Sequence, residues 1–155
     1  MTSLARRCSA LLLPMIAAAC GGGDSTSGPR IVVSGGGYLD QVGIYSAHAD
    51  AHYLLIGLEI TNTSSAEPLS AASSNFTVTT DAGVRKASSG ITMELPEYCR
   101  ADATVAQGAQ LDCAVGFEIL KAQQPVKLRY LNIDNQKTEV TLDPTQFKEL
   151  TEIPW

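Results

Sequence analysis

The sequence predicts an all-β fold, a sandwich of two sheets built from about seven short strands. Apolar and polar residues alternate over short runs, and this period of two is the pattern of strands with one buried face. Clusters of Gly, Pro, Asn, Asp and Ser separate the runs, as turns separate antiparallel strands. No long amphipathic helical pattern interrupts them. Residues 30–155 provide enough chain for one domain with one core.

The first strands surround a run of three glycines. Residues 31–33, Ile-Val-Val, open a strand, the glycines at 35–37 break it or form a bulge, and residues 38–44 continue it along a sheet edge. A phosphate-binding loop is a poor interpretation of these glycines, because neither a Gly-Lys-Ser/Thr sequence nor a helical pattern follows them.

The most regular strand covers residues 52–62. Alternate residues form one face, which we expect to build the core: His52, Leu54, Ile56, Leu58 and Ile60. The next strands form a hairpin. Residues 76–79 lead to a turn at residues 81–83, Asp-Ala-Gly, and the chain returns through residues 84–86.

Three further strands and a helical turn complete the predicted domain. Residues 111–119 alternate between apolar and polar, residues 126–130 follow Pro125, and residues 140–142 follow a turn at Asp134-Asn135. Near the end of the chain, Asp143 is a candidate N-cap and Pro144 occupies the first helical position, which predicts a short C-terminal helical turn. We expect Trp155 to dock on one end of a sheet.

The first residues have the pattern of a bacterial lipoprotein signal. Two arginines precede an apolar stretch at residues 9–16, and three alanines then lead to Cys20. The stretch is shorter than the roughly 20 apolar residues that span a bilayer, so cleavage is expected. This predicts a signal peptide over residues 1–19, acylation of the Cys20 thiol and a flexible Gly/Ser tether over residues 20–29. Ordinary secretion without a lipid is the alternative.

The predicted anchor places the protein in the cell envelope, attached to a membrane through Cys20. In a Gram-negative host, Gly21 in place of an aspartate indicates the outer membrane. Without residues 1–19, nine basic and 16 acidic residues remain, a formal net charge of −7. No basic stripe is visible in the sequence, so nucleic acid and anionic lipid headgroups are unfavourable partners for the surface of the domain.

Two cysteines remain for the domain once Cys8 leaves with the signal peptide and Cys20 carries the lipid. Cys99 and Cys113 form an even pair in an oxidising compartment, so we predict a disulfide bond between them. Closing a loop of this length stabilises the fold by about 3 kcal/mol. A redox or metal role would be indicated by Cys-x-x-Cys spacing or by neighbouring histidines.

Several segments of the domain resemble one family. Residues 53–83, followed by Gly108 and by residues 115–132, are similar to the DUF4352 family of immunoglobulin-like bacterial lipoprotein domains. The most recognisable parts are the strand that ends in Asn62-Thr63, the Phe-Glu-Ile triplet before Leu120 and the strand that follows it. The family often has proline where this chain has Leu120. The resemblance implies an extracytoplasmic immunoglobulin-like antiparallel β-sandwich with no settled activity.

No group of residues forms a catalytic pattern, and we expect neither enzyme activity nor a cofactor. Ser, His and Asp are all present, but a Gly-x-Ser-x-Gly elbow is absent. Glu94, Glu97 and Asp102 lie near Cys99 and could act as paired carboxylates on a glycoside, although a charged surface patch is the more ordinary interpretation.

A metal site is conceivable where His48, Asp50 and His52 lie two residues apart. In an extended segment these side chains would share one face and could bind zinc or copper. Such sites generally need three or four ligands, and Met93 or Asp40 could join only if folding brings them near. Solvated histidines at the start of a strand are the more ordinary interpretation.

The favoured hypothesis is a lipid-anchored module that binds another protein or an envelope component through an edge strand or a loop, without catalysis. A periplasmic metal-binding protein that uses His48 and His52 is one alternative. A carbohydrate-binding sandwich is the other, and it would stack sugars on Tyr38, Tyr45 and Tyr53, which are close in sequence.

Overall fold

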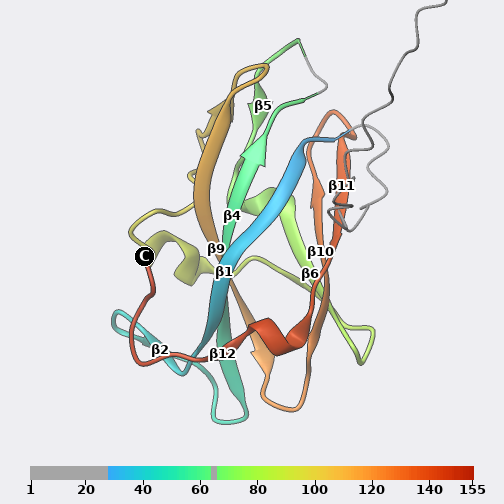
Figure 1. The fold of residues 1–155 in the computed structure, drawn as a ribbon. Helices are drawn as coiled ribbons and strands as arrows, with labels where there is room; N and C mark the ends of the chain where they lie inside the picture. Colours follow the sequence, from blue (N-terminus) through green and yellow to red (C-terminus); the bar gives the residue numbers. More distant parts are fainter. Residues whose placement is uncertain (1–27, 64–65) are drawn as a thin grey trace, which may run out of the picture.

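The computed structural model describes residues 28–63 and 66–155, so the predicted signal peptide and Cys20 lie outside the described residues. Two four-stranded sheets face each other (Figure 1). The first sheet has the order β12 (Lys148–Glu149), β1 (Arg30–Leu39), β4 (Ala51–Thr61) and β9 (Gln110–Leu120). The second has the order β11 (Lys137–Thr141), β10 (Pro125–Leu131), β6 (Phe76–Thr80) and β7 (Arg85–Ala87). The predicted all-β sandwich is confirmed.

Shorter elements lie in the connections between the main strands. Strands β2 (Gln41–Val42) and β3 (Tyr45–Ser46) form a small hairpin, and β5 (Leu69–Ser70) pairs with β8 (Thr104–Val105). The 3₁₀ helices are η1 (Ser73–Asn75), η2 (Gly90–Glu94) and η3 (Pro144–Gln146). All strand pairs in the two large sheets are antiparallel except β1 with β12, which is parallel.

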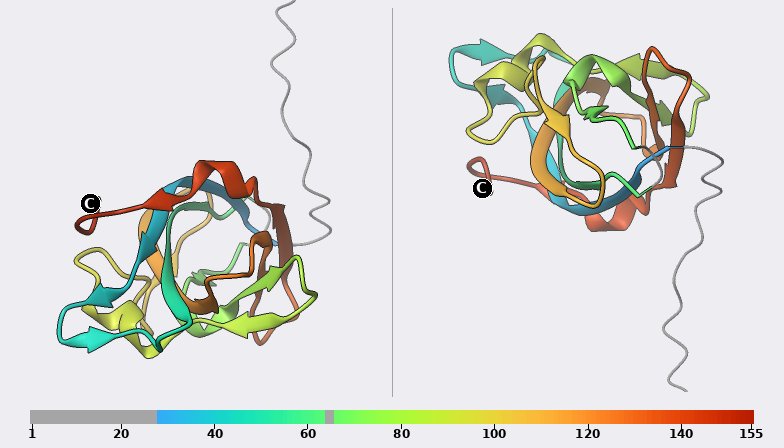
Figure 2. Two further views of the ribbon diagram at one scale, coloured as in Figure 1. Left: turned by 90° about the horizontal axis from the view of Figure 1, so that it is seen from below. Right: turned by 90° about the horizontal axis from the view of Figure 1, so that it is seen from above.

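The main core lies between the two sheets, whose arrangement around it can be followed in the end views of Figure 2. Strand β4 pairs with β9 along its whole length, from Ala51 opposite Leu120 to Thr61 opposite Gln110. Alternate side chains of β4 point inward and are buried: Leu54, Ile56, Leu58 and Ile60. Phe117 of β9 and Phe76 of the second sheet are fully buried in the same cluster. The predicted core face of the strand is therefore confirmed.

The outer face of the first sheet carries a second core, which period-two alternation did not predict. Tyr53 and Leu55 point away from the main core, yet both are buried. The β2–β3 hairpin, η2 and the last residues of the chain cover them, with Ile91 and Trp155 among the contacts. Strand β4 is thus buried on both faces, which explains its nearly continuous apolar sequence. Trp155 docks here, as expected, but on the face of the sheet beside Gly57 and not at a sheet end.

The glycine run produces a bulge inside a continuous strand. The register between β1 and β4 shifts between Val33 and Gly35, and Gly36 has a φ of 151°. A bulge in this region is therefore confirmed. The expected continuation to residue 44 along the sheet edge is wrong, because β1 ends at Leu39 and the chain turns away into the β2–β3 hairpin. Strand β12 pairs with β1 at Gly37 and Tyr38.

The turns agree with the sequence interpretation. Gly83 has a φ of 74° in the turn between β6 and β7, and Asn135 has a φ of 59° between β10 and β11. The side chain of Asp143 accepts a hydrogen bond from the Thr145 backbone N–H, so η3 has the predicted cap with Pro144 in its first turn. Across residues 28–63 and 66–155, every helix is too short to cross a bilayer.

Candidate functional site

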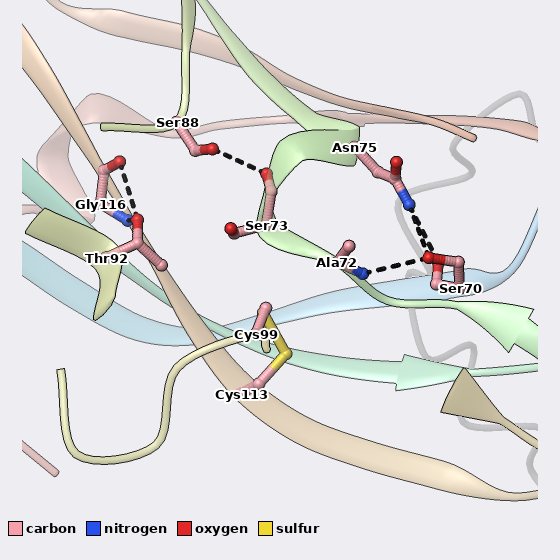
Figure 3. The surroundings of a disulfide bond; sticks show 9 residues. All are labelled: Ser70, Ala72, Ser73, Asn75, Ser88, Thr92, Cys99, Cys113 and Gly116. Carbon is pink, nitrogen blue, oxygen red and sulfur yellow. Dashed lines mark hydrogen bonds between the residues drawn. A yellow bond between two sulfur atoms is a disulfide. The ribbon is translucent and has the colours of Figure 1, made fainter. Parts of the chain in front are cut away.

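The predicted disulfide bond joins Cys99 to Cys113 (Figure 3). The Cα atoms are 4.9 Å apart, and the bond connects the loop after η2 to the edge of β9. Backbone hydrogen bonds support it on both sides: the Cys99 N–H donates to the Ala114 carbonyl at 3.0 Å, and the Ala114 N–H donates to the Glu97 carbonyl at 2.7 Å. The bond therefore fixes the loop against the first sheet.

The same edge of β9 is covered by the segment that begins at residue 88. The Thr92 hydroxyl donates to the Gly116 carbonyl at 3.3 Å and accepts from the Gly116 N–H at 2.9 Å, as Figure 3 shows. The Ser88 hydroxyl donates to the Ser73 carbonyl at 2.8 Å. Loops that pass to the outer face of the first sheet are therefore held in place by specific contacts.

The structure separates the candidate metal ligands. His48 is exposed in the turn before β4, where its Nδ1 contacts the Glu118 carboxylate. The backbone carbonyl of Asp50 accepts a hydrogen bond from the Lys121 N–H. Only His52 belongs to the strand, and it faces the interior. Asp40 pairs with Lys121 at 2.9 Å. The described residues contain no group of three or more His, Cys, Asp or Glu side chains that could hold a metal ion.

His52 has an unusual environment for an ionisable group. Its ring is 5% exposed and stacks on Tyr38 with the ring centroids 4.2 Å apart. Neither ring nitrogen has a hydrogen-bond partner, and Nδ1 lies 3.9 Å from a carboxylate oxygen of Glu149. Burial lowers the pKa of His52, although the negative charge of Glu149 opposes this shift. The pKa of His48 is shifted in the opposite direction, because the hydrogen bond of His48 to Glu118 raises it.

We expect the two histidines to titrate on opposite sides of the ordinary value of about 6.5. In an NMR titration, the His48 imidazole should protonate above this value and the His52 imidazole below it. Below about pH 6.5 the His52 imidazole is protonated in the unfolded chain but stays neutral in the folded protein. Acidification therefore favours the unfolded state. The contribution of His52 to stability is present above about pH 6.5 and falls as the solution becomes more acidic.

The stability measurement is urea unfolding of the wild-type chain and His52→Phe between about pH 7.5 and 5.5. Phenylalanine keeps an aromatic ring against Tyr38, so the variant should lose less stability on acidification. His48→Gln is the control. This substitution removes the stabilising contribution of protonated His48, which is present below about pH 6.5 and is lost as the pH rises. The His48→Gln variant should therefore lose more stability on acidification than the wild type does. Equal acid sensitivity of His52→Phe and the wild type would refute the assignment.

The tyrosines proposed for sugar stacking do not form a common surface. Tyr38 is buried in the main core, and Tyr53 is buried in the second core on the other face of the first sheet. Tyr45 is the exposed member of the three. An aromatic platform from these residues is therefore ruled out by the fold, since strand alternation sends two of them to opposite faces.

The acidic residues near the disulfide have different neighbours. Asp102 pairs with Arg100 at 3.1 Å, and Glu94 lies beside Gly43 of the β2–β3 hairpin. Glu97 lines a pocket of about 350 Å³ together with residues that include Asp112 and Trp155. The three carboxylates predicted as an acidic loop thus have separate environments, which is the arrangement expected of a charged surface.

Exposed apolar side chains lie on the β2–β3 hairpin and on η2, two elements that meet at Gly43 and Glu94. Ile44 is 87% exposed and Tyr45 is 47% exposed at the hairpin, and Met93 of η2 is 67% exposed. Gly43 has a φ of 57° and lies beside Glu94, which brings the hairpin turn against η2. We call Ile44, Tyr45 and Met93 the distal patch. Sequence reasoning missed it because residues 38–44 were assigned to a sheet edge.

Comparisons with known proteins agree with this architecture. The sequence model of the family described as "Domain of unknown function (DUF4352)" matches residues 32–140. No curated protein matches the chain. The crystal structure of ycdA from Bacillus subtilis, described as a "putative lipoprotein", is similar with a TM-score of 0.62 and 16% identity. The likeness covers 79% of this chain and 38% of ycdA, and at this identity it concerns the fold alone.

Proposed function

The chain belongs to the DUF4352 family, and from this premise we propose that it is a lipid-anchored binding module of the cell envelope without catalysis of its own. The lipoprotein signal that ends at Cys20 supports the anchor, and ycdA, which shares the fold, is itself described as a "putative lipoprotein". In a host with an outer membrane, Gly21 after the acylated cysteine favours that membrane.

The observation that carries the binding role is the distal patch. Strand β1 runs for ten residues from Arg30 near the tether to Leu39, a distance of about 33 Å. The hairpin with Ile44 and Tyr45 follows directly, so it projects at the end of the sandwich opposite the start of β1 (Figure 1). Apolar side chains held in water on a rigid loop are typical of surfaces that bind a protein.

The rest of the fold supports a rigid presentation of this patch. Val42 of the hairpin is buried in the second core together with Ile91 and Leu95. The disulfide bond fixes the chain that follows η2. A binding loop that is ordered before it meets its partner loses less conformational entropy on binding.

We expect a photo-crosslinking amino acid at Ile44 or Met93 to capture one specific protein in the native envelope, identified by mass spectrometry. The matched control is the same amino acid at Thr145, which is also exposed but lies on η3 away from the patch. Mass spectrometry of the N-terminal peptide should find acyl chains on Cys20. Equal capture at Ile44 and Thr145 would argue against the patch, and an unmodified Cys20 would argue against the anchor.

A further inference from the structure

The outer face of the second sheet is basic although the protein as a whole is acidic. Strand pairing brings Arg85 of β7 opposite Thr79, and Lys127 and Arg129 of β10 opposite Thr79 and Thr77. Lys137 of β11 completes the face, and Glu139 supplies the one carboxylate in β6, β7, β10 and β11. This basic face is not visible in the sequence, because it is assembled from strands that are distant in sequence.

Two of the four cations pair with one carboxylate within this face. Lys127 Nζ and Lys137 Nζ each lie 3.0 Å from a different oxygen of Glu139. These two lysines lower the pKa of Glu139 to about 2. Arg129 lies directly opposite Glu139 in the register of β10 and β11, yet the carboxylate is already occupied by the lysines. The guanidinium of Arg129 therefore remains available to bind a ligand.

Arg129 lines a pocket of about 280 Å³ at one end of this face. Arg85 and Thr77 line it as well, and the other lining residues are Ser74, Asn75 and Leu131. The Nε atom of Arg129 and the hydroxyl of Thr77 are buried there without hydrogen-bond partners. The amide nitrogen of Asn75 is held by Ser70 at 3.2 Å, as Figure 3 shows. The pocket thus offers two guanidinium groups and hydroxyl donors, and no carboxylate lines it.

We propose that this pocket binds a phosphate group. The planar fork of a guanidinium matches the spacing of two phosphate oxygens, and hydrogen bonds between ionised groups are stronger than neutral ones. Arg85 on β7 and Arg129 on β10 lie on either side of β6, so two forks can face one anion. The Thr77 hydroxyl between them supplies a further donor.

The position of the pocket favours a membrane headgroup as the source of the phosphate. The Thr138 hydroxyl donates to the Pro29 carbonyl at 2.6 Å, so the start of the described chain lies against β11. Leu131 of the pocket is opposite Lys137 in the next strand, and the turn that follows it carries Ile133, which is 94% exposed. Figure 1 shows this turn beside the start of β1.

A short tether would hold this end of the sandwich at the bilayer. Gly28 follows Cys20 by eight positions, a span of at most about 28 Å. Exposed Ile133 and the basic face are features of surfaces that contact anionic lipids. This assignment of the source rests on the proposed lipid anchor, whereas phosphate binding by the pocket does not.

The test follows the arginine Nε–H signals of the full ¹⁵N-labelled chain by NMR in maltoside micelles, which contain no phosphate. One arm adds inorganic phosphate and the other adds a short-chain phosphatidylglycerol. We expect saturable shifts of the Arg129 and Arg85 signals in at least one arm. Arg30 and Arg100 lie outside the pocket and serve as internal controls.

Affinity measurements on variants complete the test. Arg85→Gln, on an exposed edge position, should weaken binding by about tenfold or more, and Arg129→Lys should weaken it while retaining the charge. Lys148→Gln changes the net charge equally and should leave binding unaltered. A response to phosphatidylglycerol alone assigns the site to a lipid headgroup, and a response to inorganic phosphate assigns it to the free ion. Equal shifts of all the arginines, or none in either arm, would overturn the proposal.

Discussion

Replacing both Cys99 and Cys113 by alanine is expected to lower the free energy of unfolding by about 3 kcal/mol. The cysteines are 14 positions apart, so the bond restricts a loop of moderate length in the unfolded chain. In the folded protein both sulfur atoms belong to the main core. Urea unfolding of the purified wild-type and double-variant chains, followed by circular dichroism, measures the difference.

Reduction provides the control for this prediction. A reducing agent should shift the wild-type unfolding curve towards that of the double variant and leave the double variant unchanged. The backbone hydrogen bonds that join Ala114 to Cys99 and to Glu97 remain available in both forms, so the sandwich should still fold. If the double variant were as stable as the oxidised wild type, the bond would be dispensable for the fold.

The main core could be predicted from the sequence because its physical cause is local. The inward residues of β4 and β9 recur at every second position, and a strand that faces a core requires that period whatever its partners are. The turn at Gly83 and the cap at Asp143 were predictable for the same reason, since each depends on the conformational preferences of a few adjacent residues.

The second core was not predictable in this way. Tyr53 and Leu55 occupy the positions that alternation assigns to the polar face of β4. They are buried by segments that are distant in sequence, including Ile91 of η2 and Trp155. The run of consecutive apolar residues in β4 was the available signal, because a strand that reads as continuously apolar is buried on both faces.

The candidate sites depend even more strongly on pairing between segments that are distant in sequence. His48 and His52 are close in sequence, but one lies in a turn and the other faces the core, so their environments oppose each other. Arg85 and Arg129 are far apart in sequence and meet in one pocket because β6 pairs with both β7 and β10. Counting charges gives the net charge of the chain and not the charge of one sheet face.

Gly36→Ala is expected to lower the free energy of unfolding by more than about 3 kcal/mol. Gly36 has a φ of 151°, a conformation that residues with a side chain rarely adopt. A Cβ atom at this position would also overlap the backbone carbonyl oxygen of Leu55 on β4. Relief requires β1 to move away from β4, and β12 would move with it because it pairs with Gly37 and Tyr38.

Gly35→Ala is the matched control, because it makes the same chemical change one residue earlier. A Cβ atom at Gly35 would have no neighbour within 4 Å, so we expect a change of less than about 1 kcal/mol. Both substitutions restrict the unfolded chain equally, so the difference between the variants isolates the folded state. Urea unfolding of the two variants side by side measures it. Equal stabilities of the two variants would mean that the bulge tolerates a side chain at either glycine. The close approach of β1 to β4 would then not explain the glycine at position 36.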